Sequence, residues 1–131
     1  MNPDANSVVF DSSVVLAWLH GEAGCDLILP LIQRSLLSSV NAAEVQTRLV
    51  SQGADRKSAW EDILASVAAV VPFDAEQAEA AGALVCLTKP FGLSIGDRAC
   101  LALALSLRLP IYTADRAWLH VDVSVPVRLV R

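Results

Sequence analysis

The chain has 131 residues, of which 54% are hydrophobic and 18% are charged, and its formal net charge is −4 at pH 7. This composition excludes a disordered or low-complexity chain, and the length fits one domain over residues 1–131. The acidic balance excludes a protein that binds nucleic acid through an overall basic surface. A nucleic-acid substrate would need a local basic patch or metal ions.

Short β-branched runs alternate with longer helical patterns along the chain. In order, the sequence predicts a strand at 8–10, helices at 14–20 and 26–33, a strand at 35–40, helices at 42–52 and 56–68, a strand at 69–73, helices at 75–87 and 95–107, and strands at 110–113 and 125–130. Strands separated by helices require crossover connections and a parallel sheet with helices on both faces. The predicted fold is therefore α/β, a three-layer α/β/α sandwich around a central parallel sheet of four to five strands.

The cysteines and the apolar runs indicate in which cellular compartment the protein is expected. Cys25, Cys86 and Cys100 form no C-x-x-C pair, and an odd number leaves one thiol unpaired in any disulfide scheme. This usage is typical of a reducing compartment. The first residues lack the features of a signal peptide, and the longest uninterrupted apolar stretch, 99–105, is too short to span a membrane. We therefore expect a cytoplasmic protein that does not associate with membranes.

Two acidic residues follow predicted strands. Asp11 comes directly after the strand at 8–10, and Asp115 follows the strand at 110–113 with one residue between. In an open parallel sheet, ligands bind beyond the carboxyl ends of the strands. Asp97 lies at the start of a helix that should pack beside these strand ends. Glu44 lies in another predicted helix, on a polar face that periodicity alone would leave in solvent.

Each acid also has a purely structural interpretation. Asp11 and Asp115 occupy positions typical of helix N-caps, and Asp97 and Glu44 each stand three residues after a Ser or Asn, as in a capping box. Carboxylates that gather at one sheet edge repel one another unless a cation neutralises them. Considered together, such acids indicate a site for a hard divalent cation, suited to phosphoryl transfer.

Four segments contain these acids. They are Val8-Val9-Phe10-Asp11-Ser12-Ser13, Asn41-Ala42-Ala43-Glu44-Val45, Leu93-Ser94-Ile95-Gly96-Asp97-Arg98-Ala99 and Tyr112-Thr113-Ala114-Asp115-Arg116-Ala117-Trp118. In this order they closely resemble the PIN-domain ribonucleases, in particular the VapC toxins of bacterial toxin–antitoxin pairs. Length and element order match as well, so the resemblance covers essentially the whole chain.

The resemblance implies a metal-dependent endoribonuclease that hydrolyses RNA phosphodiester bonds with a metal-activated water, as the toxin of a type II toxin–antitoxin system. It implies that Asp11, Glu44, Asp97 and Asp115 are catalytic and hold Mg²⁺ or Mn²⁺. Ser13 matches the position where family members carry Ser or Thr at the site.

Three further residues would line the substrate position. Thr113 occupies the supporting position before the last acid, and Arg98 and Arg116 each directly follow one of the acids. The two arginines either guide a phosphate to the metals or pair with acids on the surface.

The resemblance also implies partners. Toxins of this kind bind a small VapB-like antitoxin, which lays a helix into an apolar groove, and they commonly form homodimers. The high apolar content of so small a domain agrees with a partner-binding face. Trp18, Trp60 and Trp118 are expected in the core or in an interface rather than as platforms for base stacking.

Two other classes of protein were weighed against the nuclease. A phosphatase of the haloacid dehalogenase type carries a second Asp where this chain has Ser13, and a phospho-receiver domain needs an acidic pair that Asp11 does not have. A non-catalytic PIN-fold module that binds RNA or protein stays open, because four acids indicate a capacity for metal and not turnover.

Overall fold

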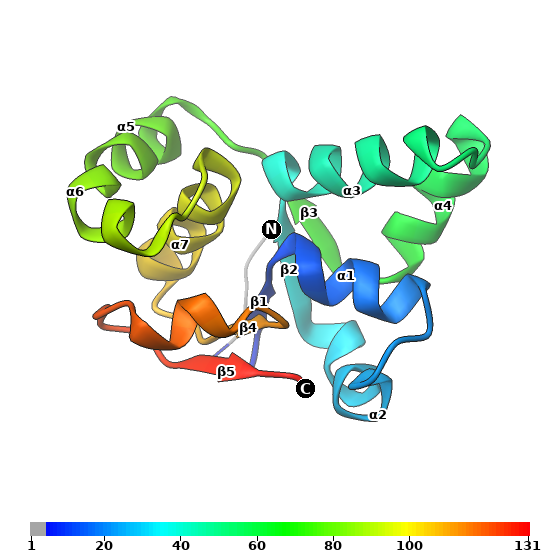
Figure 1. Ribbon diagram of the computed structural model, residues 1–131, viewed down its shortest axis with the longest axis horizontal. Helices are drawn as coiled ribbons and strands as arrows, with labels where there is room; N and C mark the ends of the chain where they lie inside the picture. The colour runs from blue at the N-terminus through cyan, green and yellow to red at the C-terminus, as the bar shows by residue number, and fades with distance from the viewer. Residues whose placement is uncertain (1–4) are drawn as a thin grey trace.

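Five short parallel strands form the centre of the molecule (Figure 1). In the computed structural model, which describes residues 5–131, their order across the sheet is β3-β2-β1-β4-β5. The strands are β1 (Val8–Phe10), β2 (Ser35–Ser38), β3 (Ala69–Val71), β4 (Ile111–Thr113) and β5 (Val127–Leu129). β1 is the central strand and pairs with both β2 and β4. β2 and β3 follow on one side of β1, and β4 and β5 follow on the other, so the strand order reverses at β1. Ligand sites of parallel sheets lie at such a reversal.

Helices cover both faces of this sheet (Figure 1). One face carries α1 (Ser12–Leu19), α2 (Cys25–Ile28), the 3₁₀ helix η1 (Leu29–Arg34), α3 (Ser39–Ser51) and α4 (Arg56–Ala65). The other carries α5 (Ala75–Ala83), α6 (Val85–Thr88), η2 (Lys89–Phe91), α7 (Ile95–Leu107) and η3 (Arg116–His120). The predicted three-layer sandwich is confirmed, with five strands in its sheet.

Successive side chains of β1 point to opposite faces of the sheet and pack into two separate hydrophobic cores. Val8 and Phe10 pack toward α1 and α3, whereas Val9 packs toward α7. Every residue from Ala99 to Ala104 is buried, because α7 lies between the sheet and α5. Burial of each large aliphatic side chain contributes about 1.5–3 kcal/mol, so α7 supplies much of the apolar stabilisation. None of the helices within residues 5–131 combines the length and the apolar character needed to cross a membrane.

Several element boundaries differ from the prediction for local reasons. The predicted helix at 26–33 is divided into α2 and η1, and Pro30, which has no backbone N–H, lies in the first turn of η1. β3 ends at Val71, since Pro72 cannot donate to the strand ladder. The predicted helix at 75–87 breaks at Leu84 into two helices. α3 begins at Ser39, three residues early, because Ser38 caps it.

The three tryptophans lie in different environments. Trp118 is fully buried in the core beside α7, as predicted, and Trp18 is partly buried against the opposite core. Trp60 on α4 is 38% exposed. The prediction allowed a position in the core or in an interface, and Trp60 does not lie in the core.

Gly24 is required where the C-terminal segment meets α2 (Figure 1). Its φ is +103°, and a Cβ at this position would overlap the carbonyl oxygen of Val130. Because the Val130 N–H donates to the Thr113 carbonyl, 2.9 Å away, the overlap would push the C-terminal segment away from β4. We expect Gly24→Ala to lower the free energy of unfolding by roughly 2–4 kcal/mol, measured by urea denaturation.

Gly53 provides the matched control. Its φ is +99°, but a Cβ there would meet no atom within 4 Å. Gly53→Ala should therefore lose only about 1 kcal/mol, from backbone strain alone. Equal losses for the two variants would contradict the role assigned to the Val130 contact.

Candidate functional site

Asp11 lies at the junction of β1, α1 and β4, and its side chain is only 2% exposed. Its Oδ1 accepts hydrogen bonds from the Ser13 hydroxyl at 2.6 Å and the Val14 N–H at 3.1 Å, and its Oδ2 accepts from the Thr113 hydroxyl at 2.6 Å. The predicted N-cap role is confirmed. Burial raises the pKa of Asp11 to about 6, against the opposing effect of these hydrogen bonds. The charge of Asp97 raises it further, so the two carboxylates interact.

The hydroxyl groups of Ser13 and Thr113 connect Asp11 to the end of β4. Ser13 Oγ accepts from the Ala114 N–H at 2.9 Å, and Thr113 Oγ1 accepts from the Asp115 N–H at 3.0 Å. Each hydroxyl therefore donates to the carboxylate and accepts from the neighbouring backbone. These contacts hold the Asp11 carboxylate in one orientation.

Asp97 lies in the first turn of α7 and forms the predicted capping box with Ser94. Asp97 Oδ2 accepts from the Ser94 N–H at 2.9 Å, and Ser94 Oγ accepts from the Asp97 N–H at 3.3 Å. The second carboxylate oxygen has no hydrogen bond to the residues that the structure describes. Asp97 thus caps the helix and still presents one free oxygen.

Glu44 is exposed on α3, and two residues place its carboxylate against α7. The buried Asn41 donates through Nδ2 to Glu44 Oε1 at 2.8 Å and to the Gly96 carbonyl at 2.9 Å. A Cβ on Gly96 would overlap the Glu44 carboxylate, so the missing side chain is what admits it. The predicted capping box of Asn41 and Glu44 is wrong, since both lie inside α3, whose N-cap is Ser38.

Three of the four acids act on one buried thiol. Cys100 lies one turn after Asp97 on α7, and burial raises its pKa well above the usual range. The charges of Asp11, Asp97 and Glu44 raise it further, and Cys100 Sγ donates to the carbonyl of Phe10, the residue before Asp11, at 3.7 Å. The structure therefore brings together acids that lie far apart in the sequence.

Asp115 is connected to this group through the backbone. Its carboxylate is exposed, and its Oδ1 accepts from the Ala117 N–H at 3.0 Å, which caps η3 as the N-cap interpretation predicts. Its own N–H donates to Thr113, which holds Asp11. Asp115 thus lies at the rim, next to the residue that orients the central acid.

The two arginines do not pair with acids. Arg98 Nη1 donates to the Ala81 carbonyl of α5 at 3.1 Å, and Arg116 is exposed at the start of η3. Within residues 5–131, neither forms an ion pair within 4.0 Å. The bond from Arg98 fastens α5 to α7.

Sequence reasoning missed Asn41 and Gly96 as site residues. Both lie in the segments that carry the acids. Neither has an ionisable side chain, so a search of the sequence for acids passes over them. The usable signal was a glycine in the first turn of a long helix, where glycine is about 1 kcal/mol less favourable than alanine and therefore needs a reason.

The acids were tested as ligands of a divalent cation. Among residues 5–131, no three His, Cys, Asp or Glu side chains are gathered closely enough to hold one ion. The ligand atoms that the four acids offer nevertheless suit Mg²⁺, because they are all carboxylate oxygens and Mg²⁺ prefers oxygen ligands. Glu44, Asp97 and Asp115 each use one oxygen in a bond within the protein and keep the other, and the buried Oδ1 of Asn41 has no partner. The residues therefore fit a hard cation by their chemistry.

The chain was compared with known families and structures. The model of the PIN domain family matches residues 8–124. A search of curated protein sequences gave no significant match. Two solved structures align with a TM-score of 0.72: a toxin–antitoxin complex from Klebsiella pneumoniae, at 17% identity over 95% of this chain and 98% of that chain, and the sarcin–ricin loop cleaving toxin VapC20 from Mycobacterium tuberculosis, at 19% identity over 92% and 100%.

A third structure is VapBC2 from Rickettsia felis bound to a DNA fragment from its promoter. It aligns with a TM-score of 0.69 at 14% identity, over 92% of this chain and 96% of that chain. At identities this low, the three structures establish the fold.

The raised pKa of Asp11 predicts how stability depends on pH. The folded protein holds this proton more tightly than the unfolded chain, so the stabilisation is complete below about pH 4 and is lost as pH rises through about 6. At 1.36 kcal/mol per pKa unit, the loss by pH 7 is about 3 kcal/mol. We expect Asp11→Asn, which cannot ionise, to remove this pH dependence, measured by urea denaturation in EDTA from about pH 4 to pH 7.

The exposed Asp26 provides the control. Asp26→Asn should keep the pH dependence of the wild type. A constant difference in stability between Asp11→Asn and the wild type across the whole range would show that burial does not perturb Asp11.

Proposed function

The chain belongs to the PIN domain family, and from this we propose that it is a metal-dependent endoribonuclease that acts as the toxin of a type II toxin–antitoxin pair. The observation that supports the proposal is a set of hydrogen bonds at the reversal point of the sheet: Thr113 donates to Asp11, and Asn41 joins Glu44 to Gly96, the residue before Asp97. A buried carboxylate whose pKa is raised, as that of Asp11 is, stabilises the fold poorly at neutral pH, but it suits a site that takes a cation and a phosphate.

The solved structures support the substrate class and the partner. One of the similar proteins is a toxin that cleaves the sarcin–ricin loop, and two others are toxin–antitoxin assemblies. We therefore propose RNA as the substrate and a VapB-like antitoxin as the partner. Homodimer formation belongs to the same proposal, and exposed apolar side chains such as Leu27, Leu29, Val85 and Leu87 provide area for both contacts.

Asp11, Glu44 and Asp97, with Asp115 at the rim, would hold Mg²⁺ or Mn²⁺. Such an ion, when bound, lowers the pKa of a water molecule and neutralises charge on the phosphate. The protein supplies orientation: Ser13 and Thr113 fix the Asp11 carboxylate.

Asn41 and Gly96 perform the same task for Glu44. The unbonded oxygen of the Glu44 carboxylate is available to accept a proton from the attacking water.

The alternative is a non-catalytic PIN-fold module that binds RNA or protein. It is favoured by one observation, namely that no ligand set within residues 5–131 is close enough to hold an ion as it stands. The two functions differ in turnover and in their need for a cation, so a cleavage assay separates them.

We expect the purified chain to cleave single-stranded RNA with Mg²⁺ or Mn²⁺ and to lose this activity in EDTA. Asp11→Asn and Asp97→Asn should each lower the cleavage rate by more than about 100-fold, since each removes a charged ligand while asparagine can still accept the capping hydrogen bond. Gel analysis of labelled RNA gives the rates, and Asp26→Asn is the control. Undiminished cleavage by both variants, once contaminating nuclease is excluded, would overturn the assignment.

Gly96→Ala tests the site without removing an acid. The new methyl group should displace the Glu44 carboxylate, which we expect to lower the cleavage rate by about 10–100-fold and to reduce the rise in melting temperature on addition of Mn²⁺. Stability in EDTA should be unchanged or higher, because alanine favours helix.

Gly82→Ala in α5 is the control for Gly96→Ala, since a Cβ there meets no atom within 4 Å. A Mn²⁺ response of Gly96→Ala equal to that of the wild type would contradict the positioning role of Gly96.

A further inference from the structure

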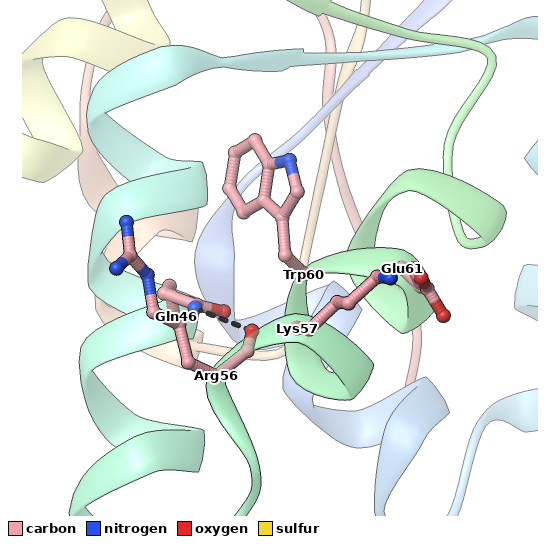
Figure 2. A pocket seen from close by; sticks show the side chains of 5 residues that line it. All are labelled: Gln46, Arg56, Lys57, Trp60 and Glu61. Atoms are coloured by element: carbon pink, nitrogen blue, oxygen red, sulfur yellow. Dashed lines mark hydrogen bonds between the residues drawn. The ribbon is translucent and has the colours of Figure 1, made fainter.

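Three shallow, open pockets along α3 and α4 share lining residues and follow one another across the surface. The first, of about 480 Å³, is lined by Glu44 and shares Thr47 and Ser51 with a second of about 490 Å³. The second shares Gln46 and Arg56 with a third of about 670 Å³ (Figure 2). We call this the α3–α4 groove. It leads from an acid of the candidate site to the exposed side of α4.

The α3–α4 groove carries positive charge in an acidic protein. Arg48, Arg56 and Lys57 line it, which is three of the ten Lys and Arg residues in a chain of net charge −4. All three are exposed, and across the described part of the chain none has an ion-pair partner within 4.0 Å. Glu61 also lines the groove, one turn after Lys57. With Glu44 at its other end, the groove has three cations and two carboxylates, a small local excess of positive charge that can attract a polyanion to an acidic protein.

An exposed aromatic side chain stands among these cations. Trp60 is 38% exposed, and Figure 2 shows it and Arg56 extending from α4 beside Gln46 of α3. The hydrogen bond from Gln46 Nε2 to the Arg56 carbonyl, at 3.0 Å, fastens the two helices at this point. An indole face beside unpaired cations is the combination that binds single-stranded nucleic acid, through base stacking and phosphate contacts.

We propose that the α3–α4 groove binds single-stranded RNA beside the cleavage site, with phosphates at Arg48, Arg56 and Lys57 and a base stacked on Trp60. This inference rests on the proposed nuclease function. Arg48 follows Glu44 by one helical turn, so a strand whose phosphate reaches the acids can continue directly onto the groove. We argue for RNA over a protein helix as the occupant because it uses both features of the surface, with phosphates at the unpaired cations and a base on the exposed indole of Trp60.

The binding test uses the Asp11→Asn chain, which should hold RNA without cutting it, and a short fluorescein-labelled single-stranded RNA of mixed sequence. The double substitution Arg56→Gln with Lys57→Gln should weaken binding about tenfold and make the slope of log affinity against log salt shallower by about 1.4. Lys89→Gln with Arg128→Gln removes two exposed charges outside the groove and should leave the slope unchanged.

Trp60 provides an independent readout. RNA should quench the fluorescence of the exposed indole, and Trp60→Leu should abolish that quenching and weaken binding about tenfold. Trp60→Phe retains an aromatic face and should recover much of the affinity. A role in folding alone would leave the RNA affinity unchanged.

Cleavage kinetics of the chain with Asp11 intact separate the two proposals. Groove variants should raise KM and leave kcat near the wild-type value, whereas Asp97→Asn should lower kcat. If the wild type cleaves RNA and the groove variants match it in KM and affinity, the inference is overturned. It is also overturned if those variants lose binding only to a co-expressed antitoxin. Absence of any cation-dependent cleavage would overturn the nuclease instead, while the binding assays would still decide the groove.

Discussion

The burial of one carboxylate between two hydroxyl groups determines the arrangement of the candidate site. Asp11 terminates the central strand, caps α1 and accepts a hydrogen bond from Thr113 on the neighbouring strand. A buried charge without partners would be strongly destabilising, so the bonds from Ser13 and Thr113 are what make its position possible. The same bonds join the ends of β1 and β4, where the sheet reverses direction. Fold stability and the position of the acid are therefore coupled through a single side chain.

Ionisation of Asp11 at neutral pH has a cost in stability that the remaining structure must offset. Burial raises the pKa of this carboxyl, and repulsion from the charge of Asp97 raises it further. The extensive apolar burial of α7 offsets this repulsion. A protein of this size with a less hydrophobic central helix would have little stability left for such a cluster.

Much of the fold was predictable because alternating strands and helices leave few topologies for a parallel sheet. Asp11 and Asp115 followed from their positions after strands, since the carboxyl ends of strands meet at one edge. Glu44 did not: its helical face is polar and exposed, and only the family resemblance singled it out. The contact that orients it joins Asn41 to Gly96, 55 residues apart, and local patterns carry no information on such pairs. The sequence left Trp60 open between the core and an interface, because periodicity cannot tell which face of α4 the neighbouring helix leaves uncovered.

In the proposed function, the charge distribution separates catalysis from substrate binding. An acidic cluster repels a polyanion, so attraction must come from cations far enough away to avoid neutralising the acids yet close enough to act on the same strand. The α3–α4 groove satisfies both conditions, since Arg48 lies one turn from Glu44 and Lys57 lies on the next helix. No ion pair joins the two charge groups across residues 5–131. In the proposed function, a bound RNA together with a divalent cation would neutralise the charges that the protein leaves unpaired.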